Sequence, residues 1–293
     1  MSNSSPRTQI VPVAIEQFDR IYSSLLVQLN PSISREKWRR LFDWGWPNPE
    51  DHTGFALLDT EGDFVGFVAT IYSDQSVDGR TERFCNLSSW IVRDGFGSSG
   101  VGLLMPVLRR SDLTITNLTS IPSVNAMFRS LGFRTLETHI RIFTPLSGLN
   151  GREERGSTIE IKENPSPNDS TISGRMRRDL LALSDRCYQW LLRSDDGTCH
   201  LAFTLGRRQG LRTIRIHHVS SPHIFAGAMT RLGLRFLSRH RALQFETDER
   251  LLSGVEVPYS RRVELPQTRL FRSSSVSASA ISNLYSELPL LNL

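Results

Sequence analysis

The sequence predicts an α/β fold in which a mixed central sheet is flanked by helices. Three observations support this prediction: apolar residues recur at helical spacing near the start, two β-rich runs are joined by a short turn, and a later strand passes through a glycine-rich turn into a helix. The length of 293 residues suits two domains, each able to bury a core of its own.

Two helices are expected before any strand. Apolar residues recur at helical spacing from Ile15 to Leu29, and Pro31 ends that run. A second helix is predicted to begin near Ser32 or Ser34, either of which could cap it, and to end before Gly45.

The next elements follow the order strand, strand, strand, helix, strand, helix, strand. The first two strands form a predicted hairpin about the turn from Asp59 to Gly62, because β-rich runs flank a polar turn that ends in glycine. The third strand leads into the glycine-rich turn. The expected strand runs are 54–62, 63–74, 83–92, 113–118 and 134–146, and the expected helices are 103–110 and 123–131.

A change of composition after the last of these strands indicates a domain boundary. The expected organisation is a first domain over residues 8–145, a linker over 146–170, a second α/β domain over 171–272 and a mobile, low-complexity tail over 273–293. In the second domain, apolar spacing predicts a helix from Met176 to Leu191, and two strands are expected about the turn from Arg207 to Gly210.

Composition excludes several classes of function. The net charge of +5 rests on scattered arginines without a basic run, which disfavours nucleic-acid binding. No apolar run is long enough for a membrane span and no secretory signal is recognisable, so a soluble cytoplasmic protein is expected. The three cysteines lack metal-site spacing, and no bound metal is predicted.

The glycine-rich turn is the clearest candidate for a binding site. It lies between the third strand and a helix, where glycines let backbone amides face outward and the helix dipole adds positive potential. Such a turn can hold a pyrophosphate. A dinucleotide fold is excluded, because the turn follows antiparallel strands and no βαβ repeat precedes it. The alternative is a tight turn without a ligand.

These features together are similar to the GNAT superfamily of acyl-CoA-dependent N-acyltransferases. The family's phosphate-binding pattern of Arg or Gln, two residues, Gly, any residue, and Gly or Ala falls on the run from Gly97 to Gly102, with Gly97 in place of the basic or amide residue. A second family feature matches Asn125, Phe128 and the run Leu131 to Phe133. The resemblance implies an acyl-CoA site formed by Ile91, Val92, Gly97, Ser98, Ser99, Gly100, Val101, Gly102, Asn125 and Phe128.

The catalytic groups are less clear from the sequence. Phe128 stands where the family often has a tyrosine that protonates the leaving thiolate, and a phenyl ring cannot donate a proton. The strand 83–92 contains no carboxylate, and Glu82 and Asp94 only flank it. The remaining candidate bases are His217 and His218 of the second domain, with the acceptor site expected between the domains. Asn125 has an alternative role as a helix cap, and Phe128 as a core residue.

The resemblance implies an N-acyltransferase that transfers an acyl group from acetyl-CoA or another acyl-CoA to a small amine. The second domain is then expected to be a degenerate GNAT-like half, as in tandem members of the family. Two alternatives stay open: a non-catalytic CoA-responsive or partner-binding protein, and a tandem-GNAT ligase that uses aminoacyl-tRNA. The lack of basic runs counts against the ligase.

Overall fold

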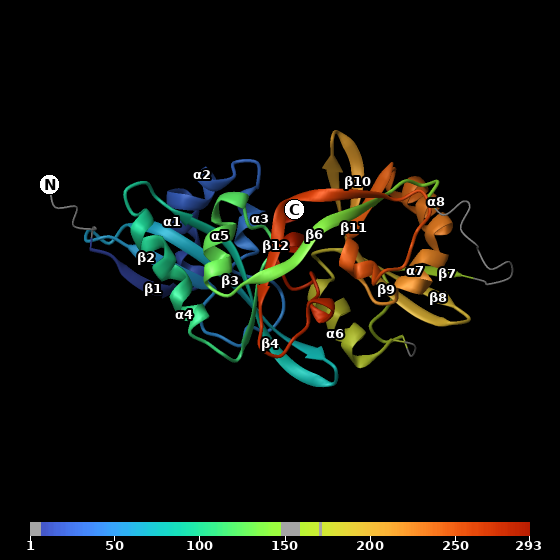
Figure 1. Ribbon diagram of the computed structural model, residues 1–293, viewed down its shortest axis with the longest axis horizontal. Helices are drawn as coiled ribbons and strands as arrows, with labels where there is room; N and C mark the ends of the chain where they lie inside the picture. Colours follow the sequence, from blue (N-terminus) through green and yellow to red (C-terminus); the bar gives the residue numbers. More distant parts are fainter. Residues whose placement is uncertain (1–6, 148–158, 170–171) are drawn as a thin grey trace. The chain divides into compact units, whose positions relative to one another are not determined.

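The computed structural model describes residues 7–147, 159–169 and 172–293, which fall into two compact units (Figure 1). Unit 1 contains the chain up to Arg134 together with residues 269–277 and 285–291. Unit 2 contains the chain from Thr135 to Thr268 together with residues 278–284 and 292–293.

The sheet of unit 1 has the strand order β1-β2-β3-β4-β5-β12. The first four strands are antiparallel neighbours, β4 and β5 are parallel, and β12 runs antiparallel to β5. The bounds are Gln9–Val13 for β1, Gly54–Leu58 for β2, Phe64–Val77 for β3, Arg80–Val92 for β4, Leu113–Asn117 for β5 and Arg261–Arg272 for β12.

Strand β1 corrects the expectation that two helices precede any strand. It pairs with β2 along its whole length, from Gln9 opposite Leu58 to Val13 opposite Gly54. The strand has only five residues and contains Pro12, which is tolerated because β1 lies at the edge of the sheet. A strand this short gives too few alternations to stand out in the sequence.

The predicted helices of unit 1 are present. A helical stretch runs from Ile15 to Leu29 and includes a π turn at its centre. The Ser34 hydroxyl accepts a hydrogen bond from the Lys37 amide at 3.4 Å and caps the next helix, as expected. The bounds are Ile15–Gln17 for η1, Phe18–Ile21 for α1, Tyr22–Leu26 for η2, Val27–Leu29 for α2, Arg35–Arg39 for α3, Gly97–Leu104 for η3, Met105–Leu108 for α4, Pro122–Ser130 for α5 and Glu287–Leu291 for α9.

The predicted hairpin between β2 and β3 is also confirmed. The Asp59 carboxylate accepts hydrogen bonds from the backbone amides of Glu61 and Asp63, both at 2.9 Å. Gly62 adopts a φ of +83°, a conformation that a glycine takes without steric cost. The turn chemistry read from the sequence therefore fixes the register of the hairpin.

Unit 2 repeats the strand pattern of unit 1 with the order β7-β8-β9-β10-β11-β6 (Figure 1). Strands β7 to β10 are antiparallel neighbours, β10 and β11 are parallel, and β6 runs antiparallel to β11. The strand bounds are Arg134–Phe143 for β6, Glu160–Glu163 for β7, Tyr188–Ser194 for β8, Gly197–Arg208 for β9, Leu211–Val219 for β10 and Gln244–Asp248 for β11. The helices are Gly174–Leu183 for α6, Pro222–Gly227 for α7, Met229–His240 for α8, Glu249–Leu252 for η4 and Ala278–Ala280 for η5.

The helix predicted from Met176 to Leu191 is too long. Helix α6 ends at Leu183, and β8 begins at Tyr188. Helical spacing of apolar residues continued into β8 only because Trp190, Leu191 and Leu192 are all buried, so the strand has no polar face that would reveal a period of two.

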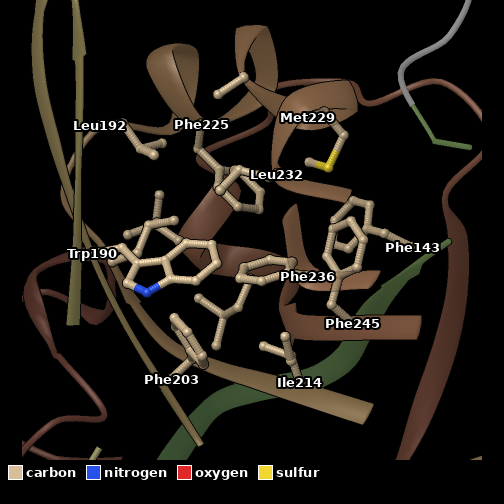
Figure 2. Close-up of a cluster of buried hydrophobic side chains, with 14 of the residues drawn as sticks. Phe143, Trp190, Leu192, Phe203, Ile214, Phe225, Met229, Leu232, Phe236 and Phe245 are labelled. Atoms are coloured by element: carbon tan, nitrogen blue, oxygen red, sulfur yellow. The ribbon is translucent and has the colours of Figure 1, made fainter. Parts of the chain in front are cut away.

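The core of unit 2 is built from aromatic and aliphatic side chains that include those of strands β6, β8, β9, β10 and β11 and of helices α7 and α8 (Figure 2). Trp190 has no exposed surface, and its ring lies 4.8 Å from that of Phe236 and 5.1 Å from that of Phe203, measured between centroids. Edge-to-face and stacked aromatic pairs of this kind add to the free energy gained by burial.

Unit 1 takes its last strand from a distant part of the chain, whereas the last strand of unit 2, β6, begins the continuous segment from Thr135 to Thr268. The chain leaves unit 1 at Arg134, and β6 then pairs with β11 of unit 2. Strand β12 begins in unit 2, and its residues from Leu270 to Arg272 pair with β5 of unit 1. This division differs from the predicted linker at 146–170, of which residues 148–158 and 170 lie outside the described residues.

The expected tail over 273–293 contains buried structure. Helix α9 belongs to unit 1, and all five of its residues are buried: Glu287, Leu288, Pro289, Leu290 and Leu291. The serine-rich stretch before it conceals this apolar segment in a reading of composition alone. In the part of the chain that the structure describes, no helix is long and apolar enough to cross a membrane.

We expect Trp190→Ala to lower the free energy of unfolding by about 3–5 kcal/mol, because a large buried side chain is replaced by a cavity. The control is Leu234→Ala on α8, whose side chain is 55% exposed and whose loss is expected to change stability by about 0.5 kcal/mol or less. Urea unfolding followed by circular dichroism measures both. Equal effects of the two substitutions would contradict the assignment of Trp190 to the core.

Candidate acyl-CoA site

The glycine-rich turn forms a 3-10 helix, η3, which continues into α4. Pro106 has no amide hydrogen and cannot bond to the Gly102 carbonyl four residues before it. The Met105 amide donates a hydrogen bond to that carbonyl instead, which is the bond between residues three apart that defines a 3-10 helix. The first amides of such a helix have no partner within it, so they are available to a ligand.

Two glycines of this turn have different roles. A Cβ at Gly100 would lie 3.0 Å from Cγ2 of Val92 on β4, so glycine lets the turn approach the strand closely. The Trp90 indole donates a hydrogen bond to the Gly100 carbonyl at 3.1 Å and ties the turn to β4. In contrast, a Cβ at Gly97 would meet no atom within 4 Å. Gly97 is therefore the position at which the ligand-binding role can be tested without disturbing the packing.

Strand β4 contains a bulge immediately before this turn. Between Ser88 and Ile91 the strand has two residues, Ser89 and Trp90, where β3 has only Val68. Ser89 adopts a φ of +53°, in the left-handed region that a non-glycine residue rarely occupies. A bulge leaves backbone groups outside the ladder and is frequent beside active sites.

The bulge reverses the faces of the strand. Cys85 and Leu87 belong to the core cluster beneath η3 and α4, and beyond the bulge Trp90 and Val92 pack against the same cluster. Without the extra residue, strict alternation would place Ile91 there instead. Asn86 lies between Cys85 and Leu87 in the strand, so its side chain faces the opposite side of the sheet.

Strands β4 and β5 separate just before the bulge. Their parallel pairing ends where Asn86 lies opposite Thr116, and β5 itself ends at Asn117 while β4 continues to Val92. Among the described residues, the β4 backbone from Leu87 to Val92 has no ladder partner on the side of β5. An extended ligand can hydrogen-bond to such a strand edge as an added strand would.

The other residues expected at the acyl-CoA site have the following positions. Ile91 and Val92 are partly buried at the end of β4. Asn125 lies inside α5, which begins at Pro122, so it is not the cap of that helix; its side-chain oxygen accepts a hydrogen bond from Ser120 at 2.7 Å. Phe128 is 1% exposed and belongs to the core, where its ring contacts those of Trp90 and Phe133.

The two candidate carboxylates of this region, Glu82 and Asp94, are not in the interior of unit 1. Glu82 is partly buried near the start of β4 and accepts a hydrogen bond from the Ser275 hydroxyl at 2.9 Å. Asp94 is exposed in the loop that follows the strand. Neither side chain lies on the stretch of β4 between Asn86 and the bulge.

The two candidate histidines belong to unit 2, whereas the glycine-rich turn belongs to unit 1. His217 is 3% exposed, and its Nε2 lies 2.9 Å from the Thr204 hydroxyl oxygen. Burial and the neighbouring His200 lower the pKa of His218 to about 3, and the two rings lie 5.3 Å apart. A group with so low a pKa is a weak proton acceptor near neutral pH.

The structure reveals a carboxylate that the sequence did not suggest, that of Glu287 in α9. Thr119 donates a hydrogen bond to its Oε1 at 2.8 Å, and the side-chain amide of Asn86 donates to its Oε2. The Asn86 oxygen in turn accepts a hydrogen bond from Thr116 at 2.9 Å. The carboxylate therefore lies where β4 and β5 separate.

The environment of Glu287 changes its ionisation. Its side chain has no exposed surface. Burial raises the pKa of the Glu287 carboxyl above its ordinary value, and the hydrogen bonds from Thr119 and Asn86 and the charge of Arg269 oppose that rise. A raised carboxyl pKa is a property of acid-base catalysts and a reason to consider the group functional.

The segment that carries Glu287 is fixed to unit 1 by further contacts. The Arg40 guanidinium donates a hydrogen bond to the Leu290 carbonyl at 3.3 Å. The ring of Tyr285 lies edge-on to that of Trp46, with centroids 5.0 Å apart.

The sequence offers one sign that this segment is buried. An apolar run, Leu288 to Leu291, directly follows the acidic residue Glu287.

One group of potential metal ligands occurs among the described residues, formed by Glu137, His139 and Glu249 of unit 2. Glu249 already pairs with Arg141 at 2.9 Å and with Arg262 at 2.8 Å. Oxygens of Glu137 accept hydrogen bonds from backbone amides. These contacts satisfy the carboxylates without a cation.

Comparison with known structures identifies the architecture. A GCN5-related N-acetyltransferase from Kribbella flavida matches 95% of this chain and 74% of its own, with a TM-score of 0.60 and 14% identity. A putative acetyltransferase from Pyrococcus horikoshii matches 96% of this chain and 94% of its own, with a TM-score of 0.55 and 13% identity.

The chain has the GNAT fold. A probable N-acyltransferase from Enterococcus faecalis V583 supports the same conclusion, with a TM-score of 0.59 and 10% identity over 93% of this chain and 74% of its own. No protein-family model matches the sequence, and no curated protein sequence is similar to it. The strand order and the similarity to these solved structures confirm the predicted mixed sheet with flanking helices.

We expect Gly100→Ala and Gly97→Ala to change stability in opposite directions. The added methyl group at Gly100 crowds Val92, and such overpacking typically costs about 1–3 kcal/mol. At Gly97 the methyl group has open space, and alanine in a helical position is favoured over glycine by about 0.5–1 kcal/mol. Thermal unfolding of both variants measures the difference, and a stable Gly100→Ala protein would contradict the described packing of the turn.

We also expect the stability of Glu287→Gln relative to wild type to rise with pH. Because the folded protein raises the pKa of this carboxyl, wild type has its full stability below the ordinary value of 4.5 and loses stability as the pH rises through the folded-state value. Glutamine has no charge to bury and escapes this loss. Melting temperatures measured from pH 4.5 to pH 8 test the sign, and a difference independent of pH would contradict it.

Proposed function

We propose that the protein is an N-acyltransferase that transfers an acyl group from acyl-CoA to the amine of a small acceptor. The observation that carries the proposal is the combination, on a GNAT fold, of a glycine-rich helix start and the unpaired β4 edge that leads to it. Acyl-CoA fits both features, because its pyrophosphate can bind the amides at the helix start and its extended pantetheine arm can hydrogen-bond along the strand edge.

In the proposed complex the pyrophosphate of CoA binds the first amides of η3, near Gly97 and Ser98. The pantetheine arm extends along β4 from Val92 toward Leu87 and bonds to the free backbone groups of that edge. The thioester then lies near the bulge at Ser89, where backbone groups outside the ladder are available to its carbonyl.

The reaction itself is aminolysis of a thioester. Holding the amine and the thioester together supplies a large part of the rate. Phe128 is a buried core residue and donates no proton, so the departing thiolate takes its proton from another source, such as water. The acyl group and the acceptor are left to experiment, with acetyl-CoA and a longer acyl-CoA as donors.

Calorimetric titration with acetyl-CoA and a longer acyl-CoA tests the binding step. Transfer to a panel of amines that includes amino sugars, amino acids and simple alkylamines tests the reaction, with thioester hydrolysis as background. Binding without transfer to any amine would favour a CoA-responsive protein without catalysis, and failure to bind either thioester would overturn the proposal.

We expect Gly97→Glu to weaken acetyl-CoA binding by about tenfold or more, equivalent to about 1.4 kcal/mol, because the carboxylate repels the pyrophosphate. Gly97→Ala is the matched control and is expected to bind as wild type does, because a Cβ at this position meets no atom within 4 Å. Isothermal titration calorimetry compares the three proteins. Equal affinity for wild type and Gly97→Glu would place the pyrophosphate elsewhere.

A further inference from the structure

A reacting amine is protonated near pH 7 and must lose a proton before it attacks the thioester. The part of β4 that lies beside the proposed thioester position carries Asn86 and Ser88 but no carboxylate. The flanking acids Glu82 and Asp94 lie outside this stretch. The site as formed by β4 and β5 alone therefore lacks a proton acceptor.

Helix α9 brings a carboxylate to this position. Asn86 pairs with Ile71 across the β3–β4 ladder, so the two side chains share a face of the sheet. Phe67 lies on the same face of β3, and its ring is stacked on that of Phe42, 5.4 Å away, in the segment that follows α3. This is the face opposite the core cluster beneath η3, and the Asn86–Glu287 hydrogen bond places α9 on it.

We infer that Glu287 is the proton acceptor for the attacking amine, an inference that rests on the proposed acyl transfer. Asn86 and Thr119 hold the two carboxylate oxygens in place, and a carboxylate has about four lone-pair sites, so acceptor capacity remains after these two hydrogen bonds. Asn86 and Thr119 thus act as positioning residues.

The proposed step balances as follows. The ammonium group of the acceptor gives one proton to the Glu287 carboxylate, and the neutral amine attacks the carbonyl carbon of the thioester. A C–N bond forms, the C–S bond breaks, and the electron pair of that bond leaves with the CoA sulfur. The nitrogen loses its second proton as the sulfur gains one, and Glu287 later releases its proton to solvent. The products are the amide, CoA with a free thiol, and one proton.

The complete burial of Glu287 has two consequences. An acceptor reaches the carboxylate only when part of its cover moves, and that cover includes the segment from Tyr285 to Leu291, which contacts Arg40 and Trp46. The same cover keeps water from the reacting groups, which limits hydrolysis of the thioester. Burial also raises the pKa of Glu287, which makes its carboxylate a stronger base than an exposed one.

The competing role for Glu287 is structural, because its hydrogen bonds also fasten α9 to the sheet. The experiment compares two nucleophiles in one protein sample. The first is the alkylamine that wild type acylates fastest, which has a pKa of about 10 and needs a base at pH 7. The second is hydroxylamine, which is neutral at that pH and needs none. The ratio of the two rates does not depend on what fraction of the sample is folded.

For Glu287→Gln we expect a loss of about 10²-fold or more with the alkylamine, the usual size of a general-base contribution, and little loss with hydroxylamine. Glutamine keeps the shape of the side chain and one acceptor oxygen for the Asn86 amide, and its NH2 group can donate to the Thr119 hydroxyl oxygen, but it accepts no proton. The matched control is Arg40→Met, which removes the bond to the Leu290 carbonyl and keeps the carboxylate. It is expected to affect both nucleophiles equally.

The pH dependence of kcat/KM for the alkylamine gives a second test. Wild type is expected to lose activity as the pH falls and Glu287 becomes protonated, whereas the activity of Glu287→Gln is expected to follow only the ionisation of the amine itself and to rise toward a pH of about 10. Equal losses with both nucleophiles in Glu287→Gln, or an unchanged acidic limb, would assign Glu287 a structural role and overturn the inference. A wild-type protein that binds acyl-CoA but acylates neither nucleophile would overturn the proposed function first, and calorimetry separates that outcome from this one.

Discussion

Strand β4 carries one residue more than β3 between Ser88 and Ile91, and most of the candidate site follows from that insertion. Because the side-chain alternation reverses at the bulge, Trp90 and Val92 turn inward and pack beneath the glycine-rich turn, where the Trp90 indole donates a hydrogen bond to the Gly100 carbonyl. The absence of a Cβ at Gly100 lets the turn lie close against the strand. The separation of β4 from β5 begins within the same few residues, so the anion cradle and the open strand edge are parts of one local arrangement.

Several of these features could be predicted from the sequence because their causes are local. The glycine-rich turn and the β2–β3 hairpin are specified by residues within a few positions of one another. Strand β1 cannot be predicted because five residues give no reliable period of hydrophobicity. The start of β8 resembles a helix in sequence because the strand is buried on both faces and lacks an alternation of polar and apolar residues. The bulge at Ser89 has no signature in a run of polar and aromatic residues that suits any strand.

Glu287 could not be predicted for a different reason. Its partners Asn86 and Thr119 are far away in the sequence, and their hydrogen bonds arise only from the tertiary fold. Glu82 and Asp94 are close to the glycine-rich turn in the sequence. The carboxylate that lies beside Asn86 of β4 in space belongs to α9. Strand β4 has no carboxylate between Arg83 and Val92, as the sequence indicates, and the fold brings one there from α9.

The repeated strand pattern of the two units supports the expectation that unit 2 is a second GNAT-like half, one without the glycine-rich turn. The return of the chain to unit 1 at Arg269 bears on how the protein is made. A ribosome completes β1 to β5 early, but Leu270 to Arg272 of β12 and then α9 emerge only after the bulk of unit 2. Until then β5 presents an unpaired edge, which is prone to aggregation, and the candidate site lacks its carboxylate. Unit 1 therefore gains its last strand and the proposed base only after the segment of unit 2 from Thr135 to Thr268 has been synthesised.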